Sequence, residues 1–301
     1  MCSLPISSVS CTNPEVVADY ACEIGENPLW HPVEERLYWC DIPKGRLFRF
    51  DPTSGVSEPW FAGRPIGGFT IQADGSLLLF MDRGTIAVLR DGNLTEVIQE
   101  IEAERLSRFN DVIADPRGRV FCGTMSSNAS RGRLYRLDLD GAIQLLLEGI
   151  GCSNGMAFTL DHRALYHTDS FARAIYLFDY DIDEGRLSNR RVFATFDEAD
   201  GLPDGITLDA EGRLWVALWD GACIARLHPN GQISDKIVLP TDKVSSLTFA
   251  GSNYSEIYIT SAGGNTRETN DPLAGALFRL RTKICGRGEF FSRIPARRAT
   301  F

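Results

Sequence analysis

Residue types that mark many common active sites are scarce in this sequence. It contains only four histidines, His31, His162, His167 and His228. None of them has the i, i+4 spacing of the helical two-histidine metal motif, and we interpret His167 as structural. The eight cysteines are scattered and include no Cys-x-x-Cys pair, so we interpret them as reduced thiols, several of them within strands.

The sequence also lacks the features of export, membrane insertion and nucleic-acid binding. The N-terminus, MCSLPISSVSC, has no basic region followed by an apolar stretch, and no apolar run approaches the roughly 18 residues that would span a bilayer. We therefore expect a cytoplasmic protein without a membrane partner. The 31 basic and 40 acidic residues give a net charge of −9, which argues against nucleic acid and slightly favours a cationic ligand or a metal.

What the chain does contain is a repeat of apolar segments with a period of two residues, bounded by Gly, Asp and Asn. The only helix we predict spans about residues 96–106. The apolar runs begin at Arg36, Ser76, Arg119, Arg163, Arg213 and Glu256, spaced by 40, 43, 44, 50 and 43 residues, and partner strands follow from Gly45, Gly84, Gly132, Arg173, Ala222 and Gly275. Six strand-rich units of this length predict an all-β, six-bladed β-propeller, whereas a β-sandwich would need no fixed period.

The repeat divides the chain into three expected parts. We predict a flexible N-terminal segment over residues 1–12, a propeller domain over 13–282 and a basic C-terminal tail on the surface over 283–301. In such rings a terminal segment commonly completes the first or the last blade. Residues 13–22, NPEVVADYAC, are placed to do so.

Four polar residues occupy the same phase of the repeat. Asp204, Asn154 and Asn110 each precede the apolar run of their unit by nine residues, and Glu26 precedes its run by ten. Equivalent positions of a propeller lie at equivalent places in the blades, so these side chains should converge at one end of the central channel. The other two units carry small residues at this phase, including Gly67, Gly68, Ser245 and Ser246, which would leave room.

Convergence of these side chains would favour a bound cation. Two carboxylates facing each other in a channel repel unless a cation lies between them. Carboxylate and amide oxygens suit Ca²⁺, Mg²⁺ or Mn²⁺, and Zn²⁺ or Fe²⁺ remain possible. So few protein ligands would leave open positions, as in catalytic rather than structural sites. The alternative is that Asn154-Gly155 and Asp204-Gly205 are ordinary turn dipeptides and that Glu26 is a solvated loop residue.

The segments around these residues resemble a known family. GENPLWHPVEERLYWCDI around Glu26, RFNDVIADPRGRVFCGTM around Asn110, SNGMAFTLD around Asn154, PDGITLDAEGRLWVALW around Asp204 and SSLTFAG at 245–251 resemble the senescence marker protein/gluconolactonase family, also called regucalcin-like. The resemblance covers about residues 13–282, and the motifs occur in the family's order. It implies a six-bladed propeller, in agreement with the repeat.

The resemblance also implies an activity and roles for individual residues. The activity would be hydrolysis of an aldonolactone, such as glucono-, xylono- or arabinonolactone, with one divalent metal ion polarising the carbonyl. Glu26, Asn154 and Asp204 would be the metal ligands, and Asp204 would also act as general base. Asn110 would line the site beside the metal and bind substrate, and Arg108 would contact the sugar hydroxyl groups.

This sequence departs from the family pattern at two relevant places. Asn110-Asp111-Val112 replaces a frequent Asn-Asp-Gly, which we interpret as a packing change. Ser126, Ser127, Asn128 and Ala129 follow Gly-Thr-Met, where the animal gluconolactonases have an acidic residue that contacts sugar. This second departure argues against a strict specificity for gluconolactone.

The sequence is compatible with other functions. A phosphotriesterase resembling diisopropylfluorophosphatase would use the same fold and a similar calcium site, and a non-catalytic calcium-binding or scaffold propeller is a third possibility. Residues 151–155, GCSNG, match the Gly-x-Ser-x-Gly motif of serine hydrolases. We interpret that match as accidental, because the motif works between a strand and a helix and the residues after Gly155 read as strand, turn and strand.

Overall fold

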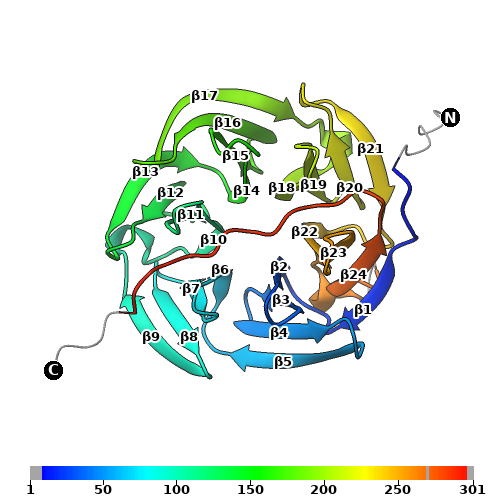
Figure 1. The fold of residues 1–301 in the computed structure, drawn as a ribbon, viewed down its shortest axis with the longest axis horizontal. Coiled ribbons are helices and arrows are strands. Elements are labelled where there is room, and N and C mark those ends of the chain that lie inside the picture. Colours follow the sequence, from blue (N-terminus) through cyan, green and yellow to red (C-terminus); the bar gives the residue numbers. More distant parts are fainter. Residues whose placement is uncertain (1–8, 269–270, 297–301) are drawn as a thin grey trace.

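The computed structural model describes residues 9–268 and 271–296 of the 301-residue chain. These residues form six four-stranded antiparallel sheets arranged as the blades of a ring (Figure 1). The predicted six-bladed β-propeller is confirmed.

In blades 1 to 5 the strands follow one another in chain order from the channel to the rim. Blade 1 contains β2 (Gly25–His31), β3 (Arg36–Asp41), β4 (Arg46–Asp51) and β5 (Val56–Ala62), and blade 2 contains β6 (Ile66–Ile71), β7 (Leu77–Met81), β8 (Ile86–Arg90) and β9 (Asn93–Ile98). Blade 3 contains β10 (Phe109–Ala114), β11 (Val120–Thr124), β12 (Gly132–Leu137) and β13 (Ile143–Ile150), and blade 4 contains β14 (Ser153–Phe158), β15 (Ala164–Asp169), β16 (Ala174–Asp181) and β17 (Arg186–Thr195). Blade 5 contains β18 (Leu202–Leu208), β19 (Leu214–Trp219), β20 (Cys223–Leu227) and β21 (Ile233–Val238).

The sixth blade joins the two ends of the chain. It contains β22 (Val244–Ala250), β23 (Glu256–Ser261) and β24 (Ala276–Arg281), and the N-terminal strand β1 (Glu15–Asp19) is its outermost strand. β1 pairs antiparallel with β24, with Val16 opposite Phe278. The prediction that residues 13–22 complete a terminal blade is therefore confirmed.

The hydrophobic core lies between the blades. Each of the six buried apolar clusters joins two neighbouring blades. Trp215 of blade 5, for example, packs edge-on against Phe249 of blade 6 with ring centroids 5.8 Å apart. The second strand of each blade is buried on both faces, so the period of two residues expected from the sequence gives way to nearly continuous apolar runs in these strands.

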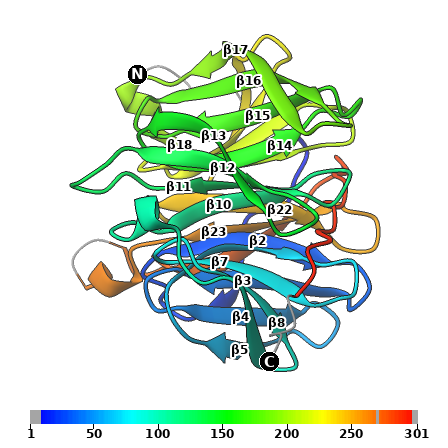
Figure 2. The ribbon, with the colours of Figure 1, turned by 90° about the vertical axis from the view of Figure 1, so that its left-hand side faces the viewer.

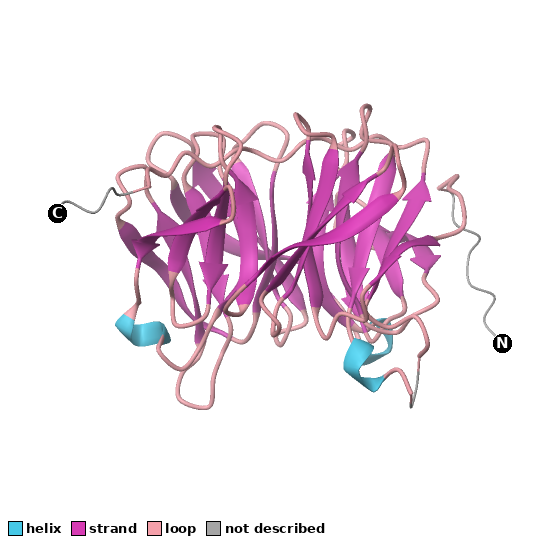
Figure 3. Cartoon of the chain, turned by 90° about the horizontal axis from the view of Figure 1, so that it is seen from below, coloured by secondary structure: helices cyan, strands magenta, loops and turns pink. Residues whose placement is uncertain are grey.

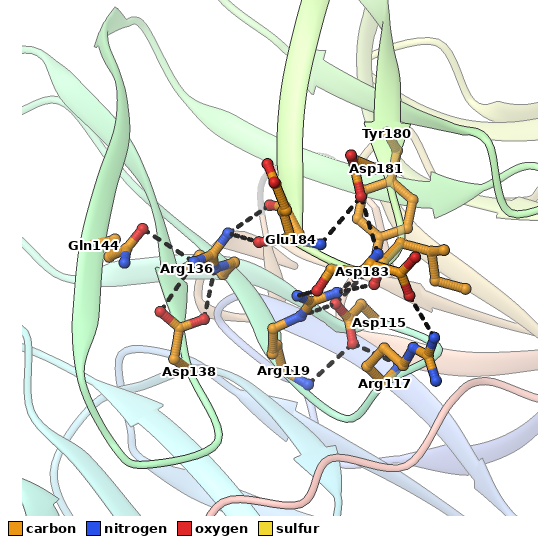
Figure 4. Close-up of polar contacts among 12 residues, drawn as sticks. Asp115, Arg117, Arg119, Arg136, Asp138, Gln144, Tyr180, Asp181, Asp183 and Glu184 are labelled. Carbon is orange, nitrogen blue, oxygen red and sulfur yellow. Dashed lines mark hydrogen bonds and ion pairs between the residues drawn. The ribbon is translucent and has the colours of Figure 1, made fainter.

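A buried charged network fixes the rim of blades 3 and 4 (Figure 4). The Arg119 guanidinium forms an ion pair with Asp115 at 2.5 Å and donates a hydrogen bond to the Tyr180 hydroxyl. It also donates to the backbone carbonyls of Ile182 and Asp183, in the turn between β16 and β17. Arg119 thus ties a turn of blade 4 to blade 3.

The predicted surface tail is more closely attached to the ring than its sequence indicates. Residues 284–296, which we call the C-terminal strap, run across one face of the ring (Figure 1). Backbone hydrogen bonds link the strap to three blades: Ala73 N–H to Ser292 O, Arg293 N–H to Gly118 O, and Ala210 N–H to Cys285 O. Ser292 and Ile294 are buried, and Glu289 and Phe290 line a small cavity of about 50 Å³ in the channel.

The prediction of a helix over residues 96–106 is wrong. Its first part belongs to β9, where Ile98 pairs with Ile86 of β8 and completes blade 2. Only residues Glu102–Glu104 form a helical turn, the 3₁₀ helix η1. Two further 3₁₀ turns, η2 (Glu198–Asp200) and η3 (Gly264–Thr266), join η1 on the face of the ring away from the strap (Figures 2 and 3).

Part of the predicted flexible N-terminal segment contacts the ring. Residues 1–8 of the predicted flexible segment lie outside the described residues, whereas Val9 packs on a core cluster and Cys11 forms a β-bridge with Thr282. The seven cysteines in the described residues are unpaired, as expected, and Cys2 lies outside them. No helix among the described residues is both long and apolar enough to cross a membrane.

Candidate active site

The four polar residues that share a repeat phase all lie on innermost strands. Glu26 is on β2, Asn110 on β10, Asn154 on β14 and Asp204 on β18. In each of these strands the pairing with the next strand shifts by one residue at this point. Such β-bulges re-aim side chains, and here they occur at the same position of four blades.

The glycines that follow two of these residues allow neighbouring blades to approach closely. A Cβ atom on Gly155 would lie 2.4 Å from the backbone nitrogen of Ile206, and one on Gly205 would lie 2.1 Å from the Ser246 Oγ. Asn154-Gly155 and Asp204-Gly205 are therefore bulged, buried strand segments, and their interpretation as turn dipeptides is wrong. Glycine is required because the adjacent inner strand occupies the space of a side chain.

The small residues of the other two blades have a different role from the one expected. A Cβ atom on Gly67 would lie 1.9 Å from the Phe109 carbonyl oxygen, so this glycine permits close packing of β6 on β10 rather than leaving room. Ser245 is fully buried and donates a hydrogen bond of 2.5 Å to the Gly25 carbonyl. The Ser246 side chain favours the ionised form of the Glu26 carboxylate and so lessens the rise of its pKa.

All five predicted site residues line one cavity at the end of the channel away from the strap. Its volume is about 250 Å³, and its lining includes Glu26, Arg108, Asn110, Asn154 and Asp204. Glu26, Asn110, Asn154 and Asp204 are all buried. The phase of the repeat thus brings these side chains together, although Glu26 and Asp204 are 178 positions apart in the sequence.

Hydrogen bonds hold the amide side chains in fixed orientations. The Asn110 Nδ2 donates to the Asn154 Oδ1 at 2.7 Å and to the Ser153 carbonyl at 2.9 Å. The Asn154 Nδ2 in turn donates to the Ser170 hydroxyl at 2.9 Å. The Oδ1 atom of Asn154, which has two lone pairs, therefore points toward the side on which Asn110 lies.

Arg108 is held from the same side of the cavity. Its Nη1 donates to the Asn110 Oδ1 at 2.6 Å and to the Phe109 carbonyl at 2.9 Å. Burial lowers the pKa of the Arg108 guanidinium, while Cys152, Glu26 and other acidic groups counteract the shift. The side chain is half-buried, so Arg108 is not a freely solvated charge.

The carboxyl groups of the cavity are strongly perturbed. Burial raises the pKa of Glu26 to about 8, and the neighbouring Asp111 carboxylate adds to the shift. Burial also raises the pKa of Asp204 well above its usual value, with further contributions from Glu26 and Asp111. Both carboxyl groups face the cost of placing negative charge in one poorly solvated space, which a cation would remove.

The donor set fits a hard divalent cation. The Asp204 Oδ1 is buried and has no hydrogen-bond partner, an arrangement that is costly unless something else binds the oxygen. Two carboxylates and one amide oxygen supply only hard donors. No cluster of three His, Cys, Asp or Glu side chains suited to a metal occurs among the described residues, so Glu26 and Asp204 would need the Asn154 amide or further ligands to complete a site.

Several residues of the cavity were not predicted. Seven further side chains line it: those of Ile24, Met125, Cys152, Ser170, Phe171, Leu202 and Trp219. Met125, Ser170 and Trp219 lie at or just after the C-terminal ends of the second strands of blades 3, 4 and 5. Because second strands run antiparallel to the inner strands, their ends reach the same face, and this could have been inferred from the repeat.

The Gly-x-Ser-x-Gly match does not form a nucleophile. Ser153 is fully buried in β14, and its hydroxyl hydrogen-bonds to the His167 Nε2 at 2.8 Å. Residues after Gly155 continue as strand, turn and strand, as expected. Burial lowers the pKa of His167 to about 4, so the pair is a neutral structural contact at physiological pH.

Comparison with known proteins relates nearly the whole ring to one protein family. Residues 24–263 match the family model described as SMP-30/Gluconolactonase/LRE-like region. The chain is 44% identical to the pentonolactonase XacC of Haloferax volcanii over 92% of this chain and 97% of that protein. It is 32% identical to the regucalcin of Gallus gallus, over 88% of this chain and 93% of that protein.

A solved structure shows the same architecture. The regucalcin of Agrobacterium tumefaciens, described as a calcium-binding protein, superimposes with a TM-score of 0.86. The alignment covers 93% of this chain and 97% of that one, at 24% sequence identity. At this level of identity the likeness concerns the fold.

Proposed function

Because this chain belongs to the SMP-30/gluconolactonase/LRE-like family, we propose that it hydrolyses sugar lactones to the corresponding sugar acids in the cavity at the end of its channel. The observation that carries the proposal is the convergence of two perturbed carboxyl groups with two amides and a guanidinium in one cavity. The pentonolactonase XacC, similar along almost its whole length, makes pentonolactones the first substrates to test.

Glu26, Asn154 and Asp204 are the residues that would hold a divalent metal ion. Such an ion, when bound, supplies Lewis-acid polarisation of the lactone carbonyl. The partnerless, buried Oδ1 of Asp204 and the hard donor set support this assignment. Calcium is the first ion to test, followed by manganese, magnesium and zinc.

Asp204 would act as the general base. A cation in the cavity would favour its ionised form, which can accept a proton from the water that attacks the carbonyl carbon. The bond between the carbonyl carbon and the ring oxygen then breaks, the ring oxygen takes up a proton, and the product is an open-chain sugar acid. Burial excludes bulk water from Asp204, which is only 5% exposed.

Arg108 and Asn110 would orient the lactone ring through its hydroxyl groups. Both side chains line the cavity, and the hydrogen bond between them fixes their relative positions. A fixed orientation raises the rate because the reacting groups need not be ordered at each turnover.

The test combines activity with metal content. Protein purified without chelator would be assayed at pH 7 against xylono-, arabinono- and gluconolactone, with spontaneous hydrolysis subtracted. We expect Asp204→Asn to lower kcat by about 10²- to 10⁴-fold, the usual contribution of a general base. Asp140→Asn, a substitution in an exposed turn, is the matched control and should keep full activity.

Two results would contradict the proposal. Full lactonase activity in Asp204→Asn protein would exclude Asp204 as general base. Activity of the wild type that resists exhaustive chelation, with no metal found by elemental analysis, would exclude the metal-dependent form of the reaction.

A further inference from the structure

The cavity has two chemically different walls. Its inner part carries the carboxylates, amides and guanidinium described above, whereas its outer part is apolar. The outer wall consists of Ile24, Met125, Phe171, Leu202 and Trp219. Ligand cavities of this kind use apolar walls for affinity and a few polar groups for orientation.

Phe171 is unusual within this wall because its ring is exposed. It is 56% exposed and is the only aromatic side chain among the exposed large hydrophobic residues of the described chain. The other aromatic of the wall, Trp219, already has the Lys243 ammonium 5.1 Å from its ring centroid. Among the described residues no cation lies over the Phe171 ring, so it is the open aromatic surface of this wall.

The exposure of Phe171 is imposed by a well-anchored loop. The Asp169 carboxylate accepts hydrogen bonds from the backbone N–H groups of Gly151, Cys152 and Ala172, at 3.0, 3.1 and 3.4 Å. The base of the Phe171 side chain packs on Gly151, where an added Cβ would lie 2.6 Å from the Phe171 Cβ. These contacts fix the position from which the ring is presented.

A second anchor ties this loop directly to the proposed catalytic residues. The Ser170 hydroxyl donates to the Pro203 carbonyl at 2.6 Å and accepts from the Asn154 Nδ2. Pro203 immediately precedes Asp204. Ser170 therefore fixes the loop to the strands that carry Asn154 and Asp204. As a result, Phe171 keeps a fixed place relative to the polar inner part of the cavity.

We propose that Phe171 is a substrate-contacting specificity residue whose ring stacks on the C–H face of the lactone while the hydroxyl groups face the polar inner wall. Aromatic faces bind apolar C–H surfaces, and a rigid ring does so with little loss of conformational freedom. The substrate class is a small sugar lactone that presents ring C–H groups on one face. This inference rests on the lactonase function proposed above.

The stacking contact should act on binding rather than on the chemical step. The face of the lactone ring is the same in the ground state and in the transition state, so its contact stabilises both equally. Phe171→Ala should therefore raise KM by roughly three- to tenfold and leave kcat nearly unchanged. Phe171→Tyr, which keeps the aromatic face, should restore KM.

Leu160→Ala provides the matched control. Leu160 is an exposed apolar residue, 44% exposed, in the turn after β14 on the face that carries the strap. Its removal should change neither KM nor kcat. An unchanged KM in Phe171→Ala would refute the proposed contact. An equal rise of KM in Leu160→Ala would refute it as well.

A binding measurement separates this inference from the lactonase proposal. A 1,4-anhydropentitol, in which a CH₂ group replaces the lactone carbonyl, cannot be hydrolysed and would be titrated calorimetrically into wild type and variants. Weaker binding to Phe171→Ala by three- to tenfold supports the contact even if no lactone is hydrolysed, in which case only the proposed reaction fails. An unchanged dissociation constant overturns the contact even if the wild type is an active lactonase.

Discussion

The Asn110 side-chain amide donates a 2.7 Å hydrogen bond to the Oδ1 of Asn154, the atom that would ligate a metal ion. Asn110 belongs to blade 3 and Asn154 to blade 4, so the contact links two blades at the candidate site. Groups that orient a metal ligand contribute to affinity without touching the metal.

Asn110→Ala should therefore weaken metal binding. Loss of an orienting partner typically costs ten- to a hundredfold in affinity, and we expect at least a tenfold increase in the dissociation constant for Ca²⁺ measured by calorimetry. Metal binding is the informative quantity, because Asn110 is also a proposed substrate contact and its loss would lower activity for either reason. Asn230→Ala, in an exposed turn, should bind Ca²⁺ like the wild type, and equal affinities for all three proteins would refute the orienting role.

The Arg119 network offers a test of stability away from the site. Arg119 is 7% exposed, and removing it would leave the buried Asp115 carboxylate without its ionic partner. Breaking a buried ion pair on one side costs about 3–5 kcal/mol. We expect Arg119→Ala to lower the free energy of unfolding by about 3 kcal/mol or more, measured by urea denaturation.

A neighbouring arginine supplies the control for this prediction. Arg117 forms an ion pair with Asp183 in which both side chains are exposed. Exposed pairs contribute about 0–1 kcal/mol, so Arg117→Ala should shift the urea midpoint only slightly. Similar losses in the two variants would mean that burial does not decide the contribution of these arginines.

The repeat made the ring and the position of the candidate site predictable. Each blade is built from segments close together in sequence, so its strands leave a local pattern of apolar runs and turns. Residues at equivalent phases must then lie at equivalent places around the ring, and Glu26, Asn154 and Asp204 do line one cavity. The reason for Gly155 was not predictable, because it depends on how closely β14 approaches Ile206 of the neighbouring blade.

The sequence does not predict structure that depends on contacts between distant residues or on packing that outweighs local propensity. The strap has no repeat pattern, and its hydrogen bonds join residues such as Gln72 and Ile294, which are 222 positions apart. The helical pattern of residues 96–106 lost to pairing with β8, since tertiary packing overrides weak local propensity. Phe171 was missed because a single exposed aromatic residue carries no sequence pattern.

The strap should contribute to stability of the ring. The Gln72 side chain donates to the Ile294 carbonyl at 2.8 Å and accepts from its N–H at 2.9 Å, in a buried place. Deletion of residues 284–301 removes these contacts and exposes the buried channel surface near Phe290. We expect a lower Tm by differential scanning calorimetry and loss of at least about 2 kcal/mol, as for several buried hydrogen bonds.

Two further variants make the strap prediction specific. Gln72→Ala, which keeps the whole chain, should lower Tm in the same direction by a smaller amount because it removes only one pair of hydrogen bonds. Gln232→Ala, at an exposed glutamine just before β21, is the matched control and should leave Tm nearly unchanged. A full strap deletion with the Tm of the wild type would show that the strap only lies on the ring.

The buried His167 predicts a sensitivity to acid. Burial lowers its pKa to about 4, whereas in an unfolded chain this histidine would titrate near its ordinary pKa of 6.5. Between these two pH values the unfolded state binds more protons than the folded state, so the free energy of unfolding decreases as the pH falls. The loss from this residue reaches about 3 kcal/mol near pH 4, from 1.4 kcal/mol per pH unit, and levels off below it.

His167→Gln isolates this contribution, since glutamine can bond to the Ser153 hydroxyl but does not titrate. Urea unfolding at a series of pH values from 7 to 4 should show the wild type losing stability more steeply than the variant, by a difference that approaches about 3 kcal/mol at pH 4. His228→Gln, at an exposed position, should follow the wild-type curve. Parallel curves for wild type and His167→Gln would show that His167 is protonated as readily in the folded chain as in the unfolded one, against its burial beside Ser153.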